Sequence, residues 1–344
     1  MPASARVTIR DVAQHAGVSQ PTASLVLGNH PRARVAAATR ERVLEAAATL
    51  GYRPNVVAQS LARGRSFALG VIVPDLRNPF FADVIAGAER VAAAAGYALL
   101  LCGETERPVA AHLETLVSRQ IDGVILDAAN AASLDAGALA GVNVVLVDEP
   151  SERWPGVASD ATGAGRLAAE HLLGFGHRAI AFIGPSSDVH TFRMRERGFV
   201  QSLRAAGVVL PSRWLRRAPA TVAGGRDAMR ALLTGRPRPT AVFCANDVVA
   251  LGALKAAAEA RVRVPADLSL VGCDDIEMAQ LVTPELTTIA VPARELGARA
   301  ARLLLRQLAG EPLRASGAPL AVRLVARGTT GPAPADDTPA VSVA

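Results

Sequence analysis

A short segment near the N-terminus has the pattern of two helices joined by a tight turn, and it constrains the fold more than any other feature. Thr8 and Asp11 have the spacing of a reciprocal N-terminal cap, and Gly17 can adopt the left-handed conformation that ends a helix. Ser19 can cap a second helix, with Pro21 in its first turn, where a missing N–H costs little. The pattern predicts a helix-turn-helix, whose second helix enters the major groove of DNA.

Apolar residues at helical spacing define the inward faces of these helices. The inward residues are Val12, Ala13, Ala16, Ala23, Val26 and Leu27. The rest of the second helix is left on the surface, namely Gln20, Pro21, Thr22, Ser24 and Leu25. A third helix is predicted over residues 39–50, with Val43, Leu44 and Ala47 facing inward and Gly51 ending it.

The positive charge of the chain lies in this same region. Residues 1–65 contain nine arginines and three acidic residues, so they carry a net charge of +6, which equals the net charge of the whole chain. A basic segment that coincides with a helix-turn-helix is typical of proteins that contact DNA phosphates. We therefore expect this region to bind DNA.

From Phe67 onward, strand-like and helix-like runs alternate. The strands are expected over residues 68–73, 98–102, 123–126, 144–147, 179–183, 241–244 and 268–272. The helices between them are expected over residues 81–95, 112–119, 163–173, 195–206, 224–233 and 248–260. Nearly continuous apolar strands separated by helices predict parallel sheets that are covered on both faces.

Polar residues follow many of these strands, at the edge where parallel sheets bind ligands. They are Asp75, Asn78, Asp148, Glu149, Asp160, Asn246, Asp247, Asp274 and Asp275. Some of them are expected only to cap loops. As a group at one cleft, they suit a neutral polar ligand rich in hydroxyl groups.

Several classes of protein are disfavoured. The start of the chain lacks the pattern of a signal peptide, and no apolar run is long enough to span a membrane, so we expect a cytoplasmic protein. Cys102, Cys244 and Cys273 fall in predicted buried strands and are expected to be free thiols, with no metal site and no cofactor. Nucleophile elbows, P-loops and paired catalytic carboxylates are missing from the sequence, so no enzymatic activity is expected.

Two alternative classes of protein share part of this pattern. Residues 163–168 match the dinucleotide fingerprint G-x-G-x-x-A, but no acidic residue ends the next strand, and tight packing of a helix on a strand explains the glycines as well. A secreted sugar-binding protein would share the second half of the chain but would need a signal peptide.

The motifs in combination resemble the LacI–GalR family of bacterial transcriptional regulators, over roughly residues 7–330. In the N-terminal part they are V-T-I-R-D-V-A at 7–13, G-V-S at 17–19, T-R-E-R-V at 39–43 and L-G-Y-R-P-N at 50–55. Further on they are N-P-F-F at 78–81, D-G-V-I at 122–125, G-H-R at 176–178, R-E-R-G-F at 195–199, P-T-A-V-F at 239–243, N-D at 246–247 and P-E-L-T-T-I at 284–289.

The resemblance implies an all-α helix-turn-helix headpiece joined to an α/β effector domain with two lobes and parallel sheets, like a periplasmic binding protein. The expected parts are a headpiece at 1–54, a hinge helix and linker at 55–66, an effector and dimerisation domain at 67–330, and a disordered tail at 331–344. Such a regulator acts as a homodimer on double-stranded operator DNA, without a membrane partner. Whether its ligand would act as inducer or corepressor stays open.

The resemblance also implies the residues that contact DNA. Gln20 and Pro21 would read bases, because glutamine can bind adenine through two hydrogen bonds whereas proline offers only apolar contact. The full set is Thr8, Arg10, Ser19, Gln20, Pro21, Thr22, Ser24, Leu25, Asn29, Tyr52, Asn55, Ala58, Gln59 and Leu61. Many family members have arginine at the position of Leu25 and serine at that of Ala36, so a guanine contact and a helix cap are expected to be missing.

Leu61 occupies the position at which the family inserts a leucine into the minor groove, where an apolar wedge unstacks a base step. The alternative is that Leu61 packs on the headpiece. The hinge helix that carries it has few apolar anchors and is short, so it is expected to form only when it packs against a partner.

In the effector domain, the positions that match family ligand contacts are Phe80, Arg195, Asn246 and Asp274, with Asp75, Asp148 and Asp160 as further candidates. Arg195 and Asp274 can each hold two neighbouring hydroxyl groups, and Phe80 can stack on a sugar face. Arg195 could instead form a structural salt bridge between the lobes. The expected ligand is a sugar or a sugar derivative bound between the lobes.

Overall fold

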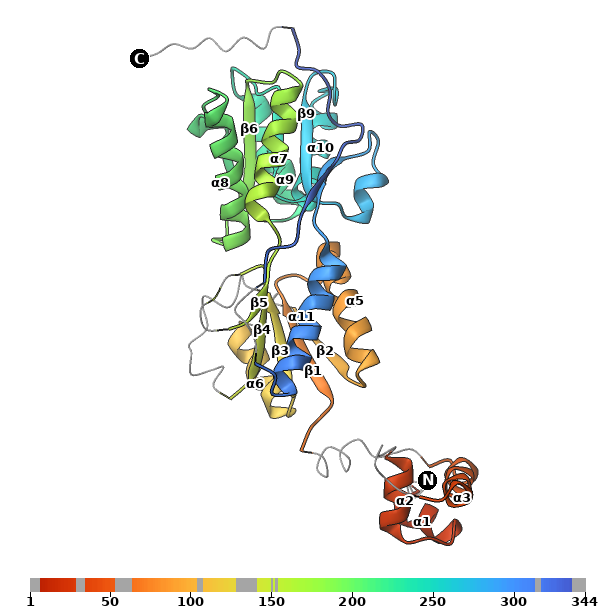
Figure 1. Cartoon of the computed structure of the whole chain (residues 1–344). Coiled ribbons are helices and arrows are strands. Elements are labelled where there is room, and N and C mark those ends of the chain that lie inside the picture. The colour runs from red at the N-terminus through yellow and green to blue at the C-terminus, as the bar shows by residue number, and fades with distance from the viewer. Residues whose placement is uncertain are drawn as a thin grey trace. The chain divides into compact units, whose positions relative to one another are not determined.

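The computed structural model describes residues 7–28, 35–52, 64–103, 108–127, 141–149, 151, 154–312 and 317–335. The chain divides into two compact units, Met1–Ser66 and Phe67–Ala344 (Figure 1). The first contains only helices in its described part, and the second contains two sheets covered by helices.

The first unit contains α1 (Ile9–His15), α2 (Gln20–Leu27) and α3 (Ala37–Thr49). The expected caps are present, since the Thr8 side chain accepts a hydrogen bond from Asp11 N and the Asp11 carboxylate accepts one from Thr8 N at 2.8 Å. Gly17 ends the first helix with a φ of 63°, and the Ser19 side chain caps α2. These caps and this turn confirm the predicted helix-turn-helix. Its sequence signals are local, because each cap and turn depends on residues three or four positions apart.

A small apolar core joins the three helices. It consists of Val12, Ala13, Ala16, Ala23, Val26, Val43, Ala46 and Ala47, with Leu27 half-buried beside it. The prediction that Leu44 faces inward is wrong, because its side chain is 50% exposed. Val43, Ala46 and Ala47 form the buried stripe, and Leu44 lies about 100° around the helix from Val43. Ala36 provides no side-chain cap to α3, as expected.

The first lobe of the second unit is built on a parallel sheet in the order β2-β1-β3-β4-β5. Its strands are β1 (Ala68–Val73), β2 (Ala98–Gly103), β3 (Gly123–Asp127), β4 (Asn143–Val147) and β5 (Gly156–Val157). Leu69, Val71 and Val73 pack with α5 (Pro79–Ala94) and α11 (Ala293–Leu308), whereas Ile72 packs with α6 (Val109–Ser118). Alternate residues of each strand therefore face opposite helical layers, which explains the nearly continuous apolar runs.

The second lobe contains a sheet in the order β11-β10-β9-β8-β6-β7, in which only the β10–β11 pair is antiparallel among the described pairs. Its strands are β6 (Ile180–Pro185), β7 (Leu215–Ala218), β8 (Ala241–Cys244), β9 (Ser269–Asp274), β10 (Thr287–Ala290) and β11 (Arg323–Val325). One face packs on α7 (Ala161–Gly174) and α8 (His190–Ala205), and the other on α9 (Val222–Thr234) and α10 (Asp247–Glu259). Short 3-10 helices occur at Ser212–Trp214 and Glu277–Gln280.

The parallel sheets and both helical layers agree with the expected fold class. The sequence-based assignment misses β5, β7, β10, β11 and α11. The four strands have four residues or fewer, and β7 carries two arginines. Such short or polar strands are formed by pairing with a neighbour, so their own residues give little periodicity.

Glycines let neighbouring helices cross closely in both lobes. A Cβ atom on Gly165 of α7 would lie 1.8 Å from the backbone oxygen of Arg195 in α8, and one on Gly198 would lie 2.0 Å from that of Thr162. Gly87 and Gly297 hold α5 against α11 in the same way, as do Gly225 and Gly252 for α9 and α10. The glycine-rich run at 163–168 thus packs a helix on a helix, rather than on a strand as expected, and it fixes the helix that carries Arg195.

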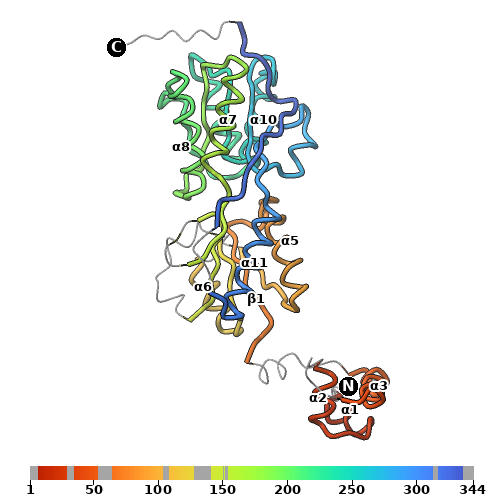
Figure 2. The backbone as a smooth tube through the Cα atoms, in the orientation of Figure 1, coloured from red at the N-terminus to blue at the C-terminus, as the bar shows by residue number. Residues whose placement is uncertain are grey.

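The chain passes three times between the lobes, as the tube in Figure 2 shows, near Ser159, Val291 and Leu320. The first and third passages are hydrogen-bonded, with Asp160 N donating to Leu320 O at 2.9 Å and Leu320 N donating to Ala158 O at 2.8 Å. The first and third passages are therefore joined to each other as neighbouring backbone segments.

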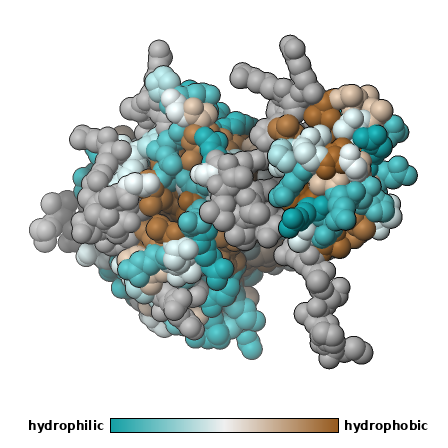
Figure 3. Space-filling model, turned by 90° about the horizontal axis from the view of Figure 1, so that it is seen from below, coloured by the Kyte–Doolittle hydropathy of each residue, from teal (hydrophilic) through white to brown (hydrophobic). Residues whose placement is uncertain are grey.

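Apolar side chains also reach the surface, and Figure 3 shows brown apolar areas among the teal hydrophilic ones on the face in view. The large exposed apolar side chains are Leu25, Leu44, Leu76, Leu101, Val117, Val209, Val222 and Leu281. Across the described part of the chain, no helix combines the length and the apolar character needed to cross a membrane.

Candidate functional site

The outer face of α2 is one candidate site. Gln20, Pro21 and Ser24 are exposed, and the side chain of Leu25 is 40% exposed. Thr22 is half-buried, and its hydroxyl lies 2.8 Å from the hydroxyl of Ser19, with which it shares a hydrogen bond. A helix that presents small polar side chains and an amide at its N-terminal end has the groups needed to contact base edges and phosphates.

The other expected DNA-contacting residues have different surroundings. Thr8 and Arg10 are exposed at the start of α1, where Thr8 also donates a hydrogen bond to the Asp11 carboxylate. Hydrogen bonds from Thr8 hold the pKa of Asp11 below its ordinary value. Tyr52 is half-buried against the core of the three helices. Asn29, Asn55, Ala58, Gln59 and Leu61 lie outside the described residues.

The second candidate site is a cleft of about 360 Å³ between the two lobes. Its wall in the first lobe includes Pro74, Asp75, Asn78, Phe80, Phe81, Asp127 and Asp148. Its wall in the second lobe includes Ser187, Asp188, Val189, Thr191, Phe192, Arg195, Ala220, Asn246 and Asp274. The cleft thus combines three phenylalanines with many carboxylates, at the carboxyl edges of both sheets.

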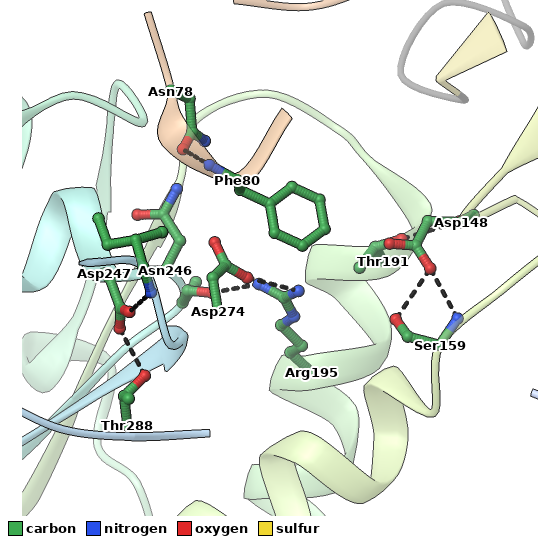
Figure 4. A network of polar contacts seen from close by, with 12 residues as sticks. Asn78, Phe80, Asp148, Ser159, Thr191, Arg195, Asn246, Asp247, Asp274 and Thr288 are labelled. Carbon is green, nitrogen blue, oxygen red and sulfur yellow. Dashed lines mark hydrogen bonds and ion pairs between the residues drawn. The ribbon is translucent and has the colours of Figure 1, made fainter. Parts of the chain in front are cut away.

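A buried ion pair forms the centre of the second-lobe wall. The Arg195 Nη2 atom lies 3.0 Å from Asp274 Oδ1, and both side chains are at most 5% exposed. Arg195 Nη1 donates to the carbonyl oxygen of Ala245 at 2.7 Å, and its guanidinium lies 5.4 Å from the centre of the Phe192 ring. Burial raises the pKa of Asp274 above its ordinary value, and the nearby Arg195 charge opposes this rise. Figure 4 shows the two charged groups pointing toward the Phe80 ring.

Asn246 and Asp247 support this pair from the start of α10. Asn246 caps the helix by accepting a hydrogen bond from Val249 N at 2.9 Å. The fully buried Asp247 carboxylate accepts hydrogen bonds from Thr288 Oγ1 at 2.6 Å and from Ile276 N at 3.0 Å. Burial raises the pKa of Asp247 to about 6, although both hydrogen bonds favour the charged form. These contacts tie the backbone that follows β8 to the backbone that follows β9 and to Thr288 within β10.

Asp148 links the two lobes at one end of the cleft. Its Oδ1 atom accepts hydrogen bonds from Ser159 N at 2.7 Å and from Ser159 Oγ at 2.8 Å. Its backbone oxygen accepts a hydrogen bond at 2.8 Å from the hydroxyl of Thr191, in the first turn of α8. Asp148 therefore ties β4 of the first lobe both to the first passage between the lobes and to a helix of the second lobe (Figure 4).

Apart from Asp148, the polar groups of the first-lobe wall have local contacts among the described residues. Asp75 pairs with the exposed Arg77 at 2.9 Å, and hydrogen bonds from Arg77 lower the pKa of Asp75. Asn78 caps α5 by accepting a hydrogen bond from Phe80 N at 3.1 Å. The Phe80 and Phe81 rings meet edge to face, with centres 5.3 Å apart. This part of the wall offers an aromatic face and two polar side chains, Asp75 and Asn78, whose described hydrogen bonds are local.

Six of the seven residues expected to bind the ligand line the cleft: Asp75, Phe80, Asp148, Arg195, Asn246 and Asp274. Asp160 is placed elsewhere, at the start of α7, where its carboxylate accepts a hydrogen bond from Gly163 N at 2.8 Å. The same bond occupies the amide that a dinucleotide phosphate would need at the glycine-rich run, which argues against the dehydrogenase alternative. Arg195 pairs with Asp274, which also belongs to the second lobe. This pair is therefore not a salt bridge between the lobes.

Several lining residues were not expected from the sequence. They are Phe81, Asp127, Ser187, Asp188, Thr191 and Phe192. Asp127 ends β3, so a systematic inspection of every strand end would have found it. Phe192 and Thr191 lie on a helix one turn before Arg195, and that helical spacing is the only signal that places them on the same side.

Comparison with known proteins identifies both units. Residues 8–55 match the model of the bacterial regulatory proteins of the lacI family, and residues 169–330 match the periplasmic binding protein-like domain. The HTH-type transcriptional repressor CytR of Escherichia coli (strain K12) is 36% identical over 330 residues, which cover 94% of this chain and 96% of CytR. The chain belongs to the LacI family. It is thus a member of a family of DNA-binding transcriptional regulators with a helix-turn-helix and a two-lobed domain.

Solved structures of transcriptional regulators have the same fold. The lac repressor dimer bound to operator and the anti-inducer ONPF matches with a TM-score of 0.84 and 32% identity, over 95% of this chain and 99% of that one. The complex of the transcriptional regulator CelR with cellobiose matches with a TM-score of 0.70 and 30% identity, over 94% of this chain and all of that one. The relatives named above are repressors or regulators of transcription rather than enzymes.

Proposed function

We propose that this LacI-family chain is a repressor that binds operator DNA as a homodimer and releases it when a small hydroxyl-rich molecule occupies the cleft. The ligand class that fits best is a sugar or a sugar derivative. The observation that carries this proposal is the cleft itself, where Arg195 and Asp274 lie buried on one wall and Phe80 faces them from the other.

On the DNA side, the proposal rests on the exposed face of α2. Gln20 is exposed and can bind adenine through two hydrogen bonds, and the exposed Pro21 can contact a thymine methyl group. Ser24 can hold a phosphate. Residues 55–66 form the hinge in this proposal, and Leu61 is the apolar wedge that enters the minor groove and bends the duplex.

On the ligand side, the carboxylates accept hydrogen bonds from hydroxyl groups, while Phe80 provides an apolar face for a sugar ring. The CelR–cellobiose complex supports a sugar in such a cleft, and the lac repressor structure supports a dimer on operator DNA. Both walls must contact the ligand, so its binding changes the angle between the lobes. By linkage, ligand and DNA then weaken each other by the same factor, typically about 1–3 kcal/mol.

The DNA half of the proposal is tested by selecting duplexes from a random pool and measuring their affinity by gel shift. Gln20→Ala is expected to change the base preference at one position of each half-site, whereas Gln201→Ala, an exposed glutamine on α8, changes nothing. Uniform weakening across all sequences would make Gln20 a phosphate contact. Leu61→Ala is expected to abolish specific binding and to leave the dimer and ligand affinity intact; unchanged operator affinity would refute the wedge.

The ligand half is tested with the same selected duplex. A sugar is expected to release the duplex from the wild type, and the double variant Arg195→Ala, Asp274→Ala is expected to stay bound. If the double variant still responds to the sugar, the ligand binds elsewhere. An absorbance change with NAD, together with no duplex binding, would favour a dehydrogenase.

A further inference from the structure

We propose that the cleft accepts only ligands without a phosphate or other anionic group, so the effector is an uncharged molecule that donates hydrogen bonds from its hydroxyl groups. This inference rests on the proposed function of the cleft as the effector site and narrows the class of ligand. It follows from the charges of the lining residues, the occupation of Arg195 and the way in which the helices begin at the cleft.

The described lining is strongly acidic. It contains five carboxylates, those of Asp75, Asp127, Asp148, Asp188 and Asp274. Arg195 is the single basic residue in that described lining. Two more arginines lie nearby, but Arg77 is paired with Asp75 and Arg193 with Asp188. Even if both are counted, the acidic groups outnumber the basic ones, and a phosphate would be repelled.

Arg195 compensates only in part, because Nη1 and Nη2 already have partners, whereas the buried Nε has no hydrogen-bond partner among the described residues. Nη1 donates to the Ala245 carbonyl oxygen, and Nη2 pairs with Asp274. A phosphate is usually held by an arginine or lysine whose donors are free to form two parallel hydrogen bonds. Here the Nη1 and Nη2 atoms of Arg195 are directed at protein oxygens. The charge of the guanidinium is offset by the equally buried carboxylate of Asp274.

The helices that begin at the cleft offer little more to an anion. Free amides at a helix N-terminus can bind phosphate, but the Asn78 side chain occupies one at α5 and the Asn246 side chain occupies one at α10. The third helix, α8, has no side-chain cap, but it begins just after Asp188, whose carboxylate adds negative charge at that terminus. None of the three therefore forms the electropositive cradle that a phosphate needs.

The same groups suit a neutral donor. Asp148 receives both of its hydrogen bonds from described residues at Oδ1, so Oδ2 has no such bond within the described part of the chain. Buried carboxylates of this kind gain more from a ligand hydroxyl than from water, because the surroundings are of low polarity. Phe80 and Phe81 add apolar contact for a ring. The ligand would thus be recognised through its O–H groups, which would donate hydrogen bonds to protein oxygens.

The test compares matched pairs of compounds by titration calorimetry on the full-length protein. Ribose and ribose 5-phosphate, glucose and glucose 6-phosphate, and adenosine and adenosine monophosphate form the panel, with inorganic phosphate as a further probe at constant ionic strength. The neutral member of any pair that binds is expected to bind about tenfold or more tightly than its phosphorylated partner. Inorganic phosphate is expected to give no saturable heat.

A charge reversal at the cleft mouth sharpens this test. Asp188 is 81% exposed at the edge of the cleft, so Asp188→Lys is expected to fold and to reduce the discrimination against the phosphorylated member by about threefold or more. Asp227→Lys is the matched control, because Asp227 is 74% exposed on α9 and does not line the cleft. The control should leave the ratio of the two affinities unchanged.

Tighter binding of a phosphorylated compound than of its neutral partner would overturn the proposal, as would saturable binding of inorganic phosphate that a bound sugar prevents. Either result would leave the proposed function intact, because a phosphorylated effector could still release DNA. Conversely, a neutral ligand that binds with the expected preference but does not affect the operator complex would contradict the proposed function and support this inference.

Discussion

The two walls of the cleft are built in different ways. In the second lobe, Arg195, Asp247 and Asp274 are buried, and their partners come from distant parts of the chain. In the first lobe, Asp75 and Asn78 have hydrogen bonds only with residues two or three positions away among the described residues, and Asp148 is the lining residue with distant partners. The difference indicates that the second lobe is a preformed platform, while the first lobe can adapt when it closes on a ligand. Substitutions in the second-lobe wall should therefore lower the stability of the protein. Substitutions in the first-lobe wall should affect only ligand binding.

Arg195→Met should have the largest effect. It leaves Asp274 buried without its counter-charge, so the free energy of unfolding should fall by about 3–5 kcal/mol. Urea unfolding followed by circular dichroism measures this loss. The double variant Arg195→Met, Asp274→Asn is the control and should recover part of the stability, because it also removes the stranded charge. A single variant as stable as the wild type would mean that the platform is not preformed.

Asp247→Asn should alter the pH dependence of stability. The folded-state pKa of about 6 lies above the ordinary value of 3.8, so the folded protein binds more protons between these values. Burial of this carboxyl therefore lowers stability as pH rises from about 4 to 6, by up to about 3 kcal/mol. Urea midpoints at several pH values should show the wild type losing stability relative to the variant over that range. Parallel curves would contradict the shifted pKa.

Thr191→Val should have an intermediate effect, because it removes the hydrogen bond from α8 to the backbone oxygen of Asp148. Stability should fall by about 1 kcal/mol, and operator affinity should change even without ligand, since the bond joins the lobes. Thr234→Val, whose hydroxyl donates to Ala231 O within α9, is the matched control. An equal change in operator affinity in both variants would rule out a specific role for Thr191.

Arg77→Ala should have the smallest effect on stability, with little change in the unfolding temperature, because its ion pair with Asp75 lies at the surface. Ligand affinity should nevertheless change, since Asp75 lines the cleft and loses its partner. Thermal unfolding and titration calorimetry separate the two outcomes. A loss of stability as large as that of Arg195→Met would show that the walls do not differ.

The parts that the sequence predicts well depend on local signals. The Thr8–Asp11 cap, the turn at Gly17 and the apolar β1 strand each involve neighbours in the chain, and all three agree with the structure. The prediction that Leu44 faces inward is wrong. It rests on the apolar character of leucine, whereas the helical spacing from Val43 turns this side chain outward.

The cleft is predictable in outline only. Strand ends indicate Asp148 and Asp274 because parallel strands bring their carboxyl ends to one edge. The same rule selects Asp160, but its carboxylate caps α7 instead. A carboxylate between a strand and a helix can bind a ligand or cap the helix, so the sequence does not distinguish the two roles. The pairing of Arg195 with Asp274 joins α8 to the end of β9, and such a tertiary contact leaves no periodic signal.

The coupling between the cleft and operator binding is tested most directly by linked affinities. Operator affinity is measured by fluorescence anisotropy with and without a compound that binds the wild type but not the Arg195→Ala, Asp274→Ala variant, and the affinity for that compound is measured with and without operator. The account predicts that each ligand weakens the other by the same factor, on the order of fivefold or more. A compound that fills the cleft and leaves operator affinity unchanged would contradict it.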